Sequence, residues 1–319
     1  MRPRHAFEAA GGWRIAVNKI PVLGTLSRGY GFLIGDFVTI ARLSWAPLLA
    51  ATVVQFYFGA QTLDASIKAL QSDDQSRMLS LGPMPFLLGV VVVVVNVMVF
   101  VALLRVVVSG DRKPGLWVYA WFGGAELRII AVYLLLGIAL AFVMVGSMLI
   151  LLILAALSKA VPVIGIVILF GCVALIIALF WAALRVSLFV PVIVTESGLG
   201  VERSWQLTRG NALRLLVIWI ATMVPLYIVT SVASSFIYGA DMPALPDFNS
   251  MWTASHNDMK AFFQAAMSAV KPYQIAVAQA QLKHWPELCI FSFIYTMVST
   301  AVYAGVSGSA YVSAAGRNA

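Results

Sequence analysis

A cluster of charged and polar side chains lies between two long apolar runs, in the segment RVSLFVPVIVTESGLGVERSWQLTRGN (residues 185–211). Arginine pairs readily with carboxylates and with phosphates, so the cluster suits either ion pairs that hold a bend of the chain or a site for a lipid headgroup. Catalysis is the third alternative, and we expect the ion-paired bend. The candidate residues are Arg185, Glu196, Arg203, Trp205, Arg209 and Asn211, joined by Arg128 and Arg214 at neighbouring helix ends.

The local pattern of this segment predicts a bend rather than one continuous helix. Pro191 should end or kink a helix, because proline has no amide hydrogen to donate. The stretch 186–195 is apolar but too short to cross a bilayer. A turn at 197–200 and a short helix at 201–209 follow it. We call the whole connection, residues 185–214, the elbow.

Other signatures of chemistry are missing from the sequence. It contains no phosphate-binding P-loop and no GxSxG, HExxH or CxxC motif. The three histidines lie in separate loops or termini, and the two cysteines lie within apolar runs, so neither residue type forms a metal-binding pattern. We therefore expect no enzyme, no cofactor and no metal site.

The composition indicates a membrane protein. Hydrophobic residues make up 61% of the 319 residues and charged residues only 11%, against roughly 25% charged in soluble domains. A helix of about 20 apolar residues crosses a bilayer. Six uncharged runs have about that length or more, and they are residues 43–63, 86–104, 129–157, 160–184, 215–240 and 288–316. We expect an all-α bundle of six transmembrane helices with interfacial helices, residues 37–316, after an N-terminal segment, residues 1–36, that lacks a signal-peptide core.

The basic residues are divided unevenly between the two sides of these runs. Counting along alternating loops, 15 of the 21 Lys and Arg residues fall on the side of the termini and the elbow, and 6 fall on the other side. Basic loops stay in the cytoplasm, so the N- and C-termini and the elbow should be cytoplasmic. The net charge of +8 then reflects membrane orientation, and we expect the lipid bilayer as a partner and no nucleic acid.

Two parts of the chain resemble each other. One run ends in LLRV (103–106) and a later run ends in ALRV (183–186), and the runs that follow them begin GAELR (124–128) and GNALR (210–214). Two similar helical hairpins, related by an axis along the membrane normal, would give this pattern. The placement of arginine at cytoplasmic helix ends would also produce it, so both explanations stay open.

The elbow also resembles a segment of a known family, the bacterial membrane domain fused to some glycerophosphodiester phosphodiesterases, which is also found in multi-pass proteins of poorly defined role. The resemblance implies an inner-membrane protein in a bacterium. In the fused proteins the hydrolase is a separate soluble barrel, for which this chain has no room, so the resemblance implies no enzyme here. The matching residues are Arg185, Ser187, Leu188, Pro191, Ile193, Glu196, Gly200, Ser204, Trp205, Leu207, Thr208, Gly210 and Asn211.

The loop between the last two runs, residues 241–287, contains an amphipathic pattern. Apolar residues recur there at helical spacing and define one face, and Lys271-Pro272 should end that helix. We expect this helix to lie on the outer leaflet or to cap the bundle, with partner docking and a lid over a cavity as alternatives. The outer face consists of Met259, Phe262, Phe263, Met267 and Val270.

The predicted spans carry no ionisable residue in their middle, whereas proton- or sodium-coupled transporters usually do. Asn96 is polar and lies within a span, where it could bond a neighbouring helix or contact a substrate. We expect a non-enzymatic scaffold or accessory subunit that engages a membrane-protein partner or anionic phospholipid. The alternative is a lipid or small-molecule permease without charge coupling. A tightly filled bundle would favour the first, and a lipid-sized cavity between the two hairpins would favour the second.

Overall fold

The computed structural model describes residues 18–72, 82–112, 122–158, 163–196, 198–255 and 258–316. Within these ranges every regular element is a helix and there is no strand. In chain order the elements are α1 (Val22–Gly35), α2 (Phe37–Ser72), α4 (Met84–Ser109), α5 (Gly124–Ser158), α6 (Val163–Val186), α7 (Phe189–Thr195), α8 (Val201–Leu207), α9 (Ala212–Tyr238), η1 (Gly239–Asp241), α10 (Phe248–Ala254), α11 (Met259–Lys283) and α12 (Trp285–Ala314).

Six stretches of the described chain are helical, long and apolar enough to cross a membrane. They lie in α2, α4, α5, α6 with α7, α9 with η1, and α12, and each overlaps one of the six runs predicted from the sequence. The prediction of an all-helical, multi-pass membrane protein is therefore confirmed.

Helix α12 forms the centre of the bundle and packs against α1, α2, α4 and α9. It carries small residues where it crosses α1, and small residues let helix backbones approach closely. A methyl group built on Gly305 would lie 2.8 Å from the carbonyl oxygen of Gly29, so neither position has room for a side chain. The close crossing fixes α1 against the bundle.

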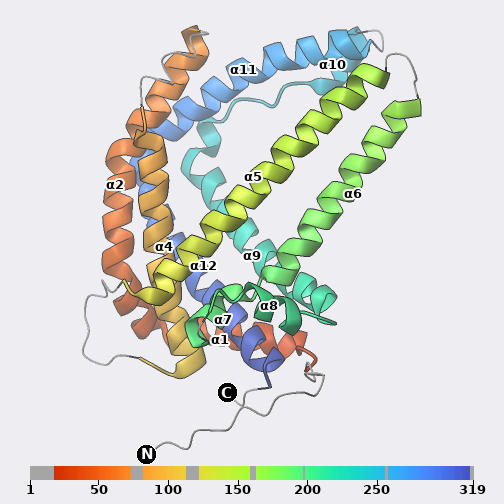
Figure 1. The fold of residues 1–319 in the computed structure, drawn as a ribbon. Coiled ribbons are helices and arrows are strands. Elements are labelled where there is room, and N and C mark those ends of the chain that lie inside the picture. The colour runs from red at the N-terminus through yellow and green to blue at the C-terminus, as the bar shows by residue number, and fades with distance from the viewer. Residues whose placement is uncertain are drawn as a thin grey trace, which may run out of the picture.

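Helices α5 and α6 form a long hairpin that leans away from this centre (Figure 1). Large apolar side chains on both helices are exposed, for example Phe142 at 76% and Phe170 at 69%. Such side chains are stable in hydrocarbon but not in water, so this arm must be covered by lipid or by another protein in the membrane.

Helix α11 runs across the end of the bundle opposite α7 and α8 (Figure 1). The prediction that Lys271-Pro272 ends a helix was wrong, because α11 is continuous from Met259 to Lys283 with Pro272 inside it. A proline within a helix removes one backbone hydrogen bond, and helices with enough packing tolerate that loss. Helix α11 has such packing, since it contacts α2, α10 and α12.

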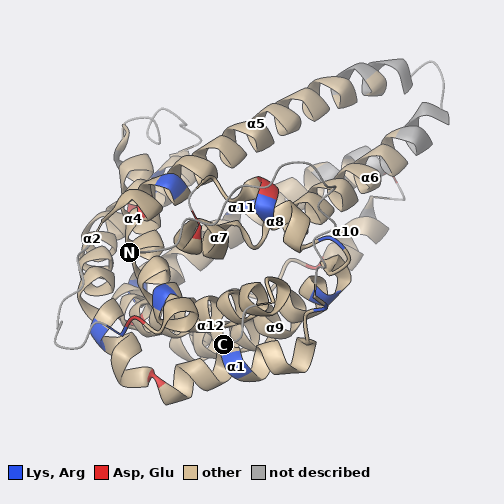
Figure 2. Cartoon of the chain, turned by 60° about the horizontal axis from the view of Figure 1, so that its bottom comes forward, with Lys and Arg blue, Asp and Glu red and all other residues tan. Residues whose placement is uncertain are grey.

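The first and last described segments of the chain meet at the end of the bundle that carries α1, α7 and α8. A methyl group on Gly316 would lie 2.7 Å from the amide nitrogen of Asn18. Figure 2 brings this end forward and shows basic segments around it, while α5 and α6 are free of charge over most of their length.

Candidate functional site

The elbow begins where α6 stops, and the predicted bend before Pro191 lies at Ser187 and Leu188. Pro191 has no amide hydrogen to offer the carbonyl of Ser187 one turn earlier, so one hydrogen bond of a continuing helix would be lost at this point. The chain turns and forms α7, whose residues Phe189 to Ile193 are all buried. The predicted connector is therefore a short buried helix.

Two hydroxyl side chains of α8 and its C-terminal end close the break. The Ser204 hydroxyl donates to the carbonyl of Arg185 (3.0 Å) and accepts from the amide of Leu188 (3.1 Å). The Thr208 hydroxyl lies 3.0 Å from the same Arg185 carbonyl. Ser204 and Thr208 are both fully buried. They satisfy backbone groups that the interrupted helix leaves without partners.

The side chain of Arg185 lies over two aromatic rings. Its guanidinium carbon lies 4.9 Å from the centre of the Trp181 ring and 5.3 Å from that of Trp205, and Nη1 reaches the carbonyl of Trp205 at 3.5 Å. The faces of these rings attract a cation. The ion pair between Arg185 and an elbow carboxylate that we considered is not among the described contacts.

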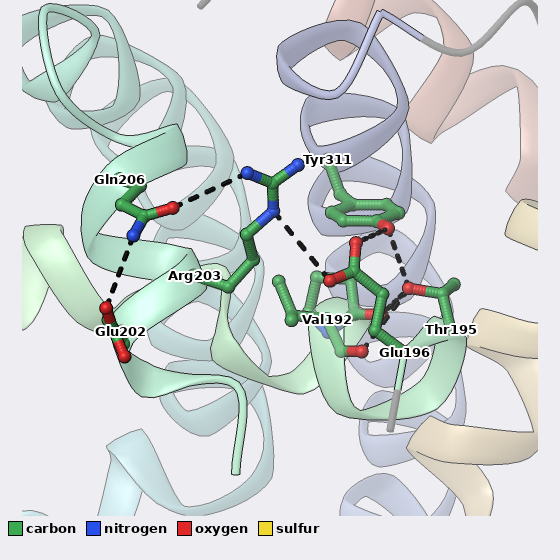
Figure 3. A network of polar contacts seen from close by, with 8 residues as sticks. Val192, Thr195, Glu196, Glu202, Arg203, Gln206 and Tyr311 are labelled. Atoms are coloured by element: carbon green, nitrogen blue, oxygen red, sulfur yellow. Dashed lines mark hydrogen bonds and ion pairs between the residues drawn. The ribbon is translucent and has the colours of Figure 1, made fainter. Parts of the chain in front are cut away.

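The Glu196 carboxylate joins the elbow to the central helix (Figure 3). The buried Tyr311 of α12 donates its hydroxyl to Glu196 Oε1 at 3.0 Å, and that hydroxyl lies 2.7 Å from the hydroxyl of Thr195. Arg203 Nε stands 3.7 Å from the other carboxylate oxygen. One ion pair and one buried tyrosine thus tie the end of α7 to α8 and α12.

Asn211 and Arg214 hold the segment that precedes α1. The side chain of Asn211 accepts from the amide of Ile20 (3.1 Å) and donates to the carbonyl of Asn18 (3.0 Å), and Arg214 donates to the carbonyl of Ile20 (3.1 Å). Arg128 donates to the carbonyl of Gly198 (3.4 Å). These three predicted residues therefore bind backbone, not carboxylates.

Arg209 stands apart from the other predicted residues. It is exposed, and its side chain makes no hydrogen bond or ion pair with a residue that the structure describes. The neighbouring surface hollow, about 830 Å³ between Gly198 and Gln206, contains Glu202 beside Arg203, so its charges compensate each other. The structure brings the elbow residues together as a clamp, and it gives this hollow no surplus of positive charge.

Sequence reasoning missed a buried ion pair between α4 and α5. Glu126 is 0% exposed, and its carboxylate lies 3.1 Å from Arg105 Nη2 and accepts from the amide of Gly123 at 3.0 Å. One feature of the sequence could have revealed Glu126: it lies in the first turn of a predicted helix, where the positive end of the helix favours a carboxylate. A surface pair between Arg112 and Asp36 (2.9 Å) was also missed, and that hydrogen bond raises the pKa of Arg112.

A cavity of about 630 Å³ lies between α4, α5, α9 and α12, and Asn96 contributes to its wall. The amide of Asn96 donates to the carbonyl of Val92 in its own helix (2.8 Å), so this bond does not link two helices. The lining residues are mostly aliphatic or aromatic, and none is charged. They are Val92, Val93, Asn96, Val97, Phe100, Ile129, Tyr133, Trp219, Met223, Thr300 and Tyr303.

The outer face of α11 is described only in part. Met259 and Phe263 lie outside the residues whose side chains the structure describes. Phe262 packs edge-on against Trp252 at 5.3 Å, Val270 is half-buried, and Met267 is 72% exposed. Among the described residues of the predicted face, some side chains are therefore packed and others are exposed.

The described residues contain no group of three His, Cys, Asp or Glu side chains that could hold a metal ion. No family model, curated protein or solved structure matches the chain. The resemblance of the elbow to the phosphodiesterase membrane domain stays a prediction.

Proposed function

We propose that this protein binds a lipid or another apolar molecule within the membrane, as a permease or transport component without intramembrane charge coupling. The cavity carries the proposal, because it lies between helices of the two predicted hairpins, α4 with α5 on one side and α9 on the other. Its volume of about 630 Å³ falls within the range of roughly 300–1,000 Å³ typical of small-molecule sites.

The exposed rim of the cavity supports access from the side. Val93 of α4, Tyr133 of α5 and Met223 of α9 line the cavity and are each about half exposed. Since all three lie in helices that can cross a membrane, their exposed surfaces would face hydrocarbon. None of the lining residues is charged, which suits an apolar ligand.

In this proposal the elbow is a clamp that fixes the ends of α6, α9 and α12, and the exposed Arg209 is the residue best placed to meet anionic phospholipid. We further propose that both termini and the elbow face the cytoplasm of a bacterial inner membrane, that the two hairpins are a repeat, and that α1, α10 and α11 lie at the interfaces. The distribution of Lys and Arg supports this orientation.

A cysteine replacing Arg209 should react with a membrane-impermeant maleimide only after the cells are opened; reaction in intact cells would reverse the orientation.

An accessory subunit is the second candidate, and the α5–α6 arm favours it. The arm stands away from the bundle and exposes large apolar residues on both helices (Figure 1). A partner helix could pack there as well as lipid could. Extraction of the native protein into lipid discs, followed by mass spectrometry, would distinguish a stoichiometric protein from bound lipid alone.

The cavity proposal has a direct test in the same discs. Met223→Trp adds bulk at the rim, whereas Ile176→Trp adds the same side chain at a position of α6 that is 66% exposed and does not line the cavity. We expect wild type and Ile176→Trp to retain a co-purifying lipophilic molecule after delipidation, and Met223→Trp to lose most of it. Equal retention by all three proteins would contradict the proposal.

A further inference from the structure

Three residues that line the cavity, Tyr133, Thr300 and Tyr303, have hydroxyl groups that make no hydrogen bond with any residue that the structure describes. Threonines elsewhere in the long helices behave differently. Thr52 and Thr222 each donate to the carbonyl one turn earlier, at 2.8 Å. A hydroxyl without a partner in an apolar environment costs free energy. The three cavity hydroxyls are therefore available to a molecule in the cavity.

Asn96 adds an acceptor to these donors. Its amide nitrogen is occupied by the carbonyl of Val92, and no described donor reaches its Oδ1. Asn96 lies near the middle of α4, and Thr300 and Tyr303 lie near the middle of α12. The polar part of the wall is thus deep within the span, far from the headgroup region.

The wall does not suit an ionised group. None of the lining residues carries a charge, and an unpaired ion in a medium of low polarity is strongly destabilised. A phosphate or carboxylate could not rest against the hydroxyl groups without a counterion. The ligand should therefore be uncharged where it meets them.

Access from the elbow side is blocked by packed side chains. Leu104 of α4, Ile129 of α5 and Phe189 of α7 belong to one buried cluster there, and Tyr133 packs edge-on against Phe189 at 5.1 Å. The buried pair of Arg105 and Glu126 lies about one turn further along α4 and α5. The exposed rim of the cavity leads to the bilayer, so a ligand would arrive already dissolved in lipid.

We propose that the cavity binds one uncharged amphiphile taken from the bilayer, with a hydroxyl or ester group hydrogen-bonded by Thr300, Tyr303 and Asn96 and an apolar chain along the valines of α4. Diacylglycerol and long-chain alcohols have this chemistry. This inference rests on the proposed function and names the ligand class for the same cavity.

The test compares two photoreactive lipids in discs that contain the full-length protein. Diacylglycerol and phosphatidic acid carry identical chains with a diazirine at the same carbon, so they differ only in the charged phosphate. We expect diacylglycerol to label the peptides around Val92–Phe100 and Thr300–Tyr303 at least several-fold more than phosphatidic acid. Thr300→Val and Tyr303→Phe should each lower diacylglycerol labelling about fivefold at sub-saturating probe, the effect of one net hydrogen bond.

Thr222→Val is the matched control, because the Thr222 hydroxyl is satisfied within α9 and does not line the cavity. It should leave labelling unchanged. Equal labelling by both lipids, insensitive to Thr300→Val and Tyr303→Phe but blocked by Met223→Trp, would overturn the ligand class and leave the proposed function intact. Labelling of neither peptide by either lipid would overturn both.

Discussion

Arg105 and Arg185 occupy the same place in two similar stretches of sequence, LLRV and ALRV, yet they have different surroundings. Arg105, at the end of α4, faces the fully buried carboxylate of Glu126. Arg185, at the end of α6, lies over the rings of Trp181 and Trp205. The positive charge of Arg105 is balanced by a carboxylate inside the protein. The positive charge of Arg185 lies at a partly exposed aromatic site.

The surroundings of the two arginines differ because different elements follow them in the chain. In the first hairpin α4 packs directly on α5, so a charge at the contact is taken out of water and needs an opposite charge. In the second hairpin α7 and α8 lie between α6 and α9 in the chain order, and hydrogen bonds of the Ser204 and Thr208 hydroxyl groups to the backbone fix the bend. The residue that corresponds to Glu126 is Ala212, so no carboxylate is available there. Similar sequence therefore does not imply similar electrostatics.

The largest effect should come from Glu126→Ala, which leaves Arg105 in a buried contact without its carboxylate. Breaking such a pair by removing one partner costs about 3 kcal/mol or more. We expect a clear drop in the midpoint of thermal unfolding in detergent. Glu202→Ala, at an exposed carboxylate of α8, is the control and should change stability by less than about 0.5 kcal/mol. If both variants lost a similar amount of stability, the buried pair of the first hairpin would contribute no more than an exposed carboxylate of the second.

Ser204→Ala should have an intermediate effect in the second hairpin. It leaves the amide of Leu188 without a partner in a buried position, which costs about 2 kcal/mol. Gln206→Ala on the exposed side of the same helix is the control. Limited proteolysis at the elbow measures local opening, and faster cleavage of Ser204→Ala alone is expected. Unchanged cleavage would show that the bend does not depend on this hydroxyl.

The smallest effect should come from Arg185→Gln, because the change removes ring contacts and one long hydrogen bond to the carbonyl of Trp205 but no described ion pair. A cation over aromatic rings at a partly exposed site contributes about 1 kcal/mol. A double-mutant cycle with Trp205→Leu isolates this contribution, and the two changes should be less than additive. Full additivity would mean that the stacking does not stabilise the elbow, and a loss as large as that of Glu126→Ala would make the two arginines equivalent.

The sequence predicted the helical fold well because long uncharged runs have few stable alternatives in a bilayer. Turn residues were also informative: Gly200 has φ +74°, and a side chain there would meet the carbonyl of Phe189. Pro191 marked the end of α6 correctly, whereas Pro272 did not end α11. A proline is tolerated where the remaining contacts of the helix outweigh one lost bond, and those contacts are not visible in local sequence.

The partners of the polar residues could not be predicted. Because arginines and a glutamate lie together in the elbow sequence, we expected ion pairs between them. Instead, Asn211 and Arg214 bind backbone groups almost 200 positions earlier in the chain. Tyr311 meets Glu196 across 115 positions of sequence. The cavity depends on how far α5 leans from α9 and α12, and helix tilt is set by packing that composition does not encode.

The central place of α12 has a consequence for biogenesis. Ribosomes make α1, α2, α4 and α9 before α12, yet each of the four packs against it. The earlier helices must therefore wait in the bilayer without α12, with only part of their packing available, such as that of α2 on α4. The contact between Gly29 and Gly305 then acts as a late assembly step, so a bulky residue at Gly305 should leave membrane insertion intact and stall the protein as loosely associated helices.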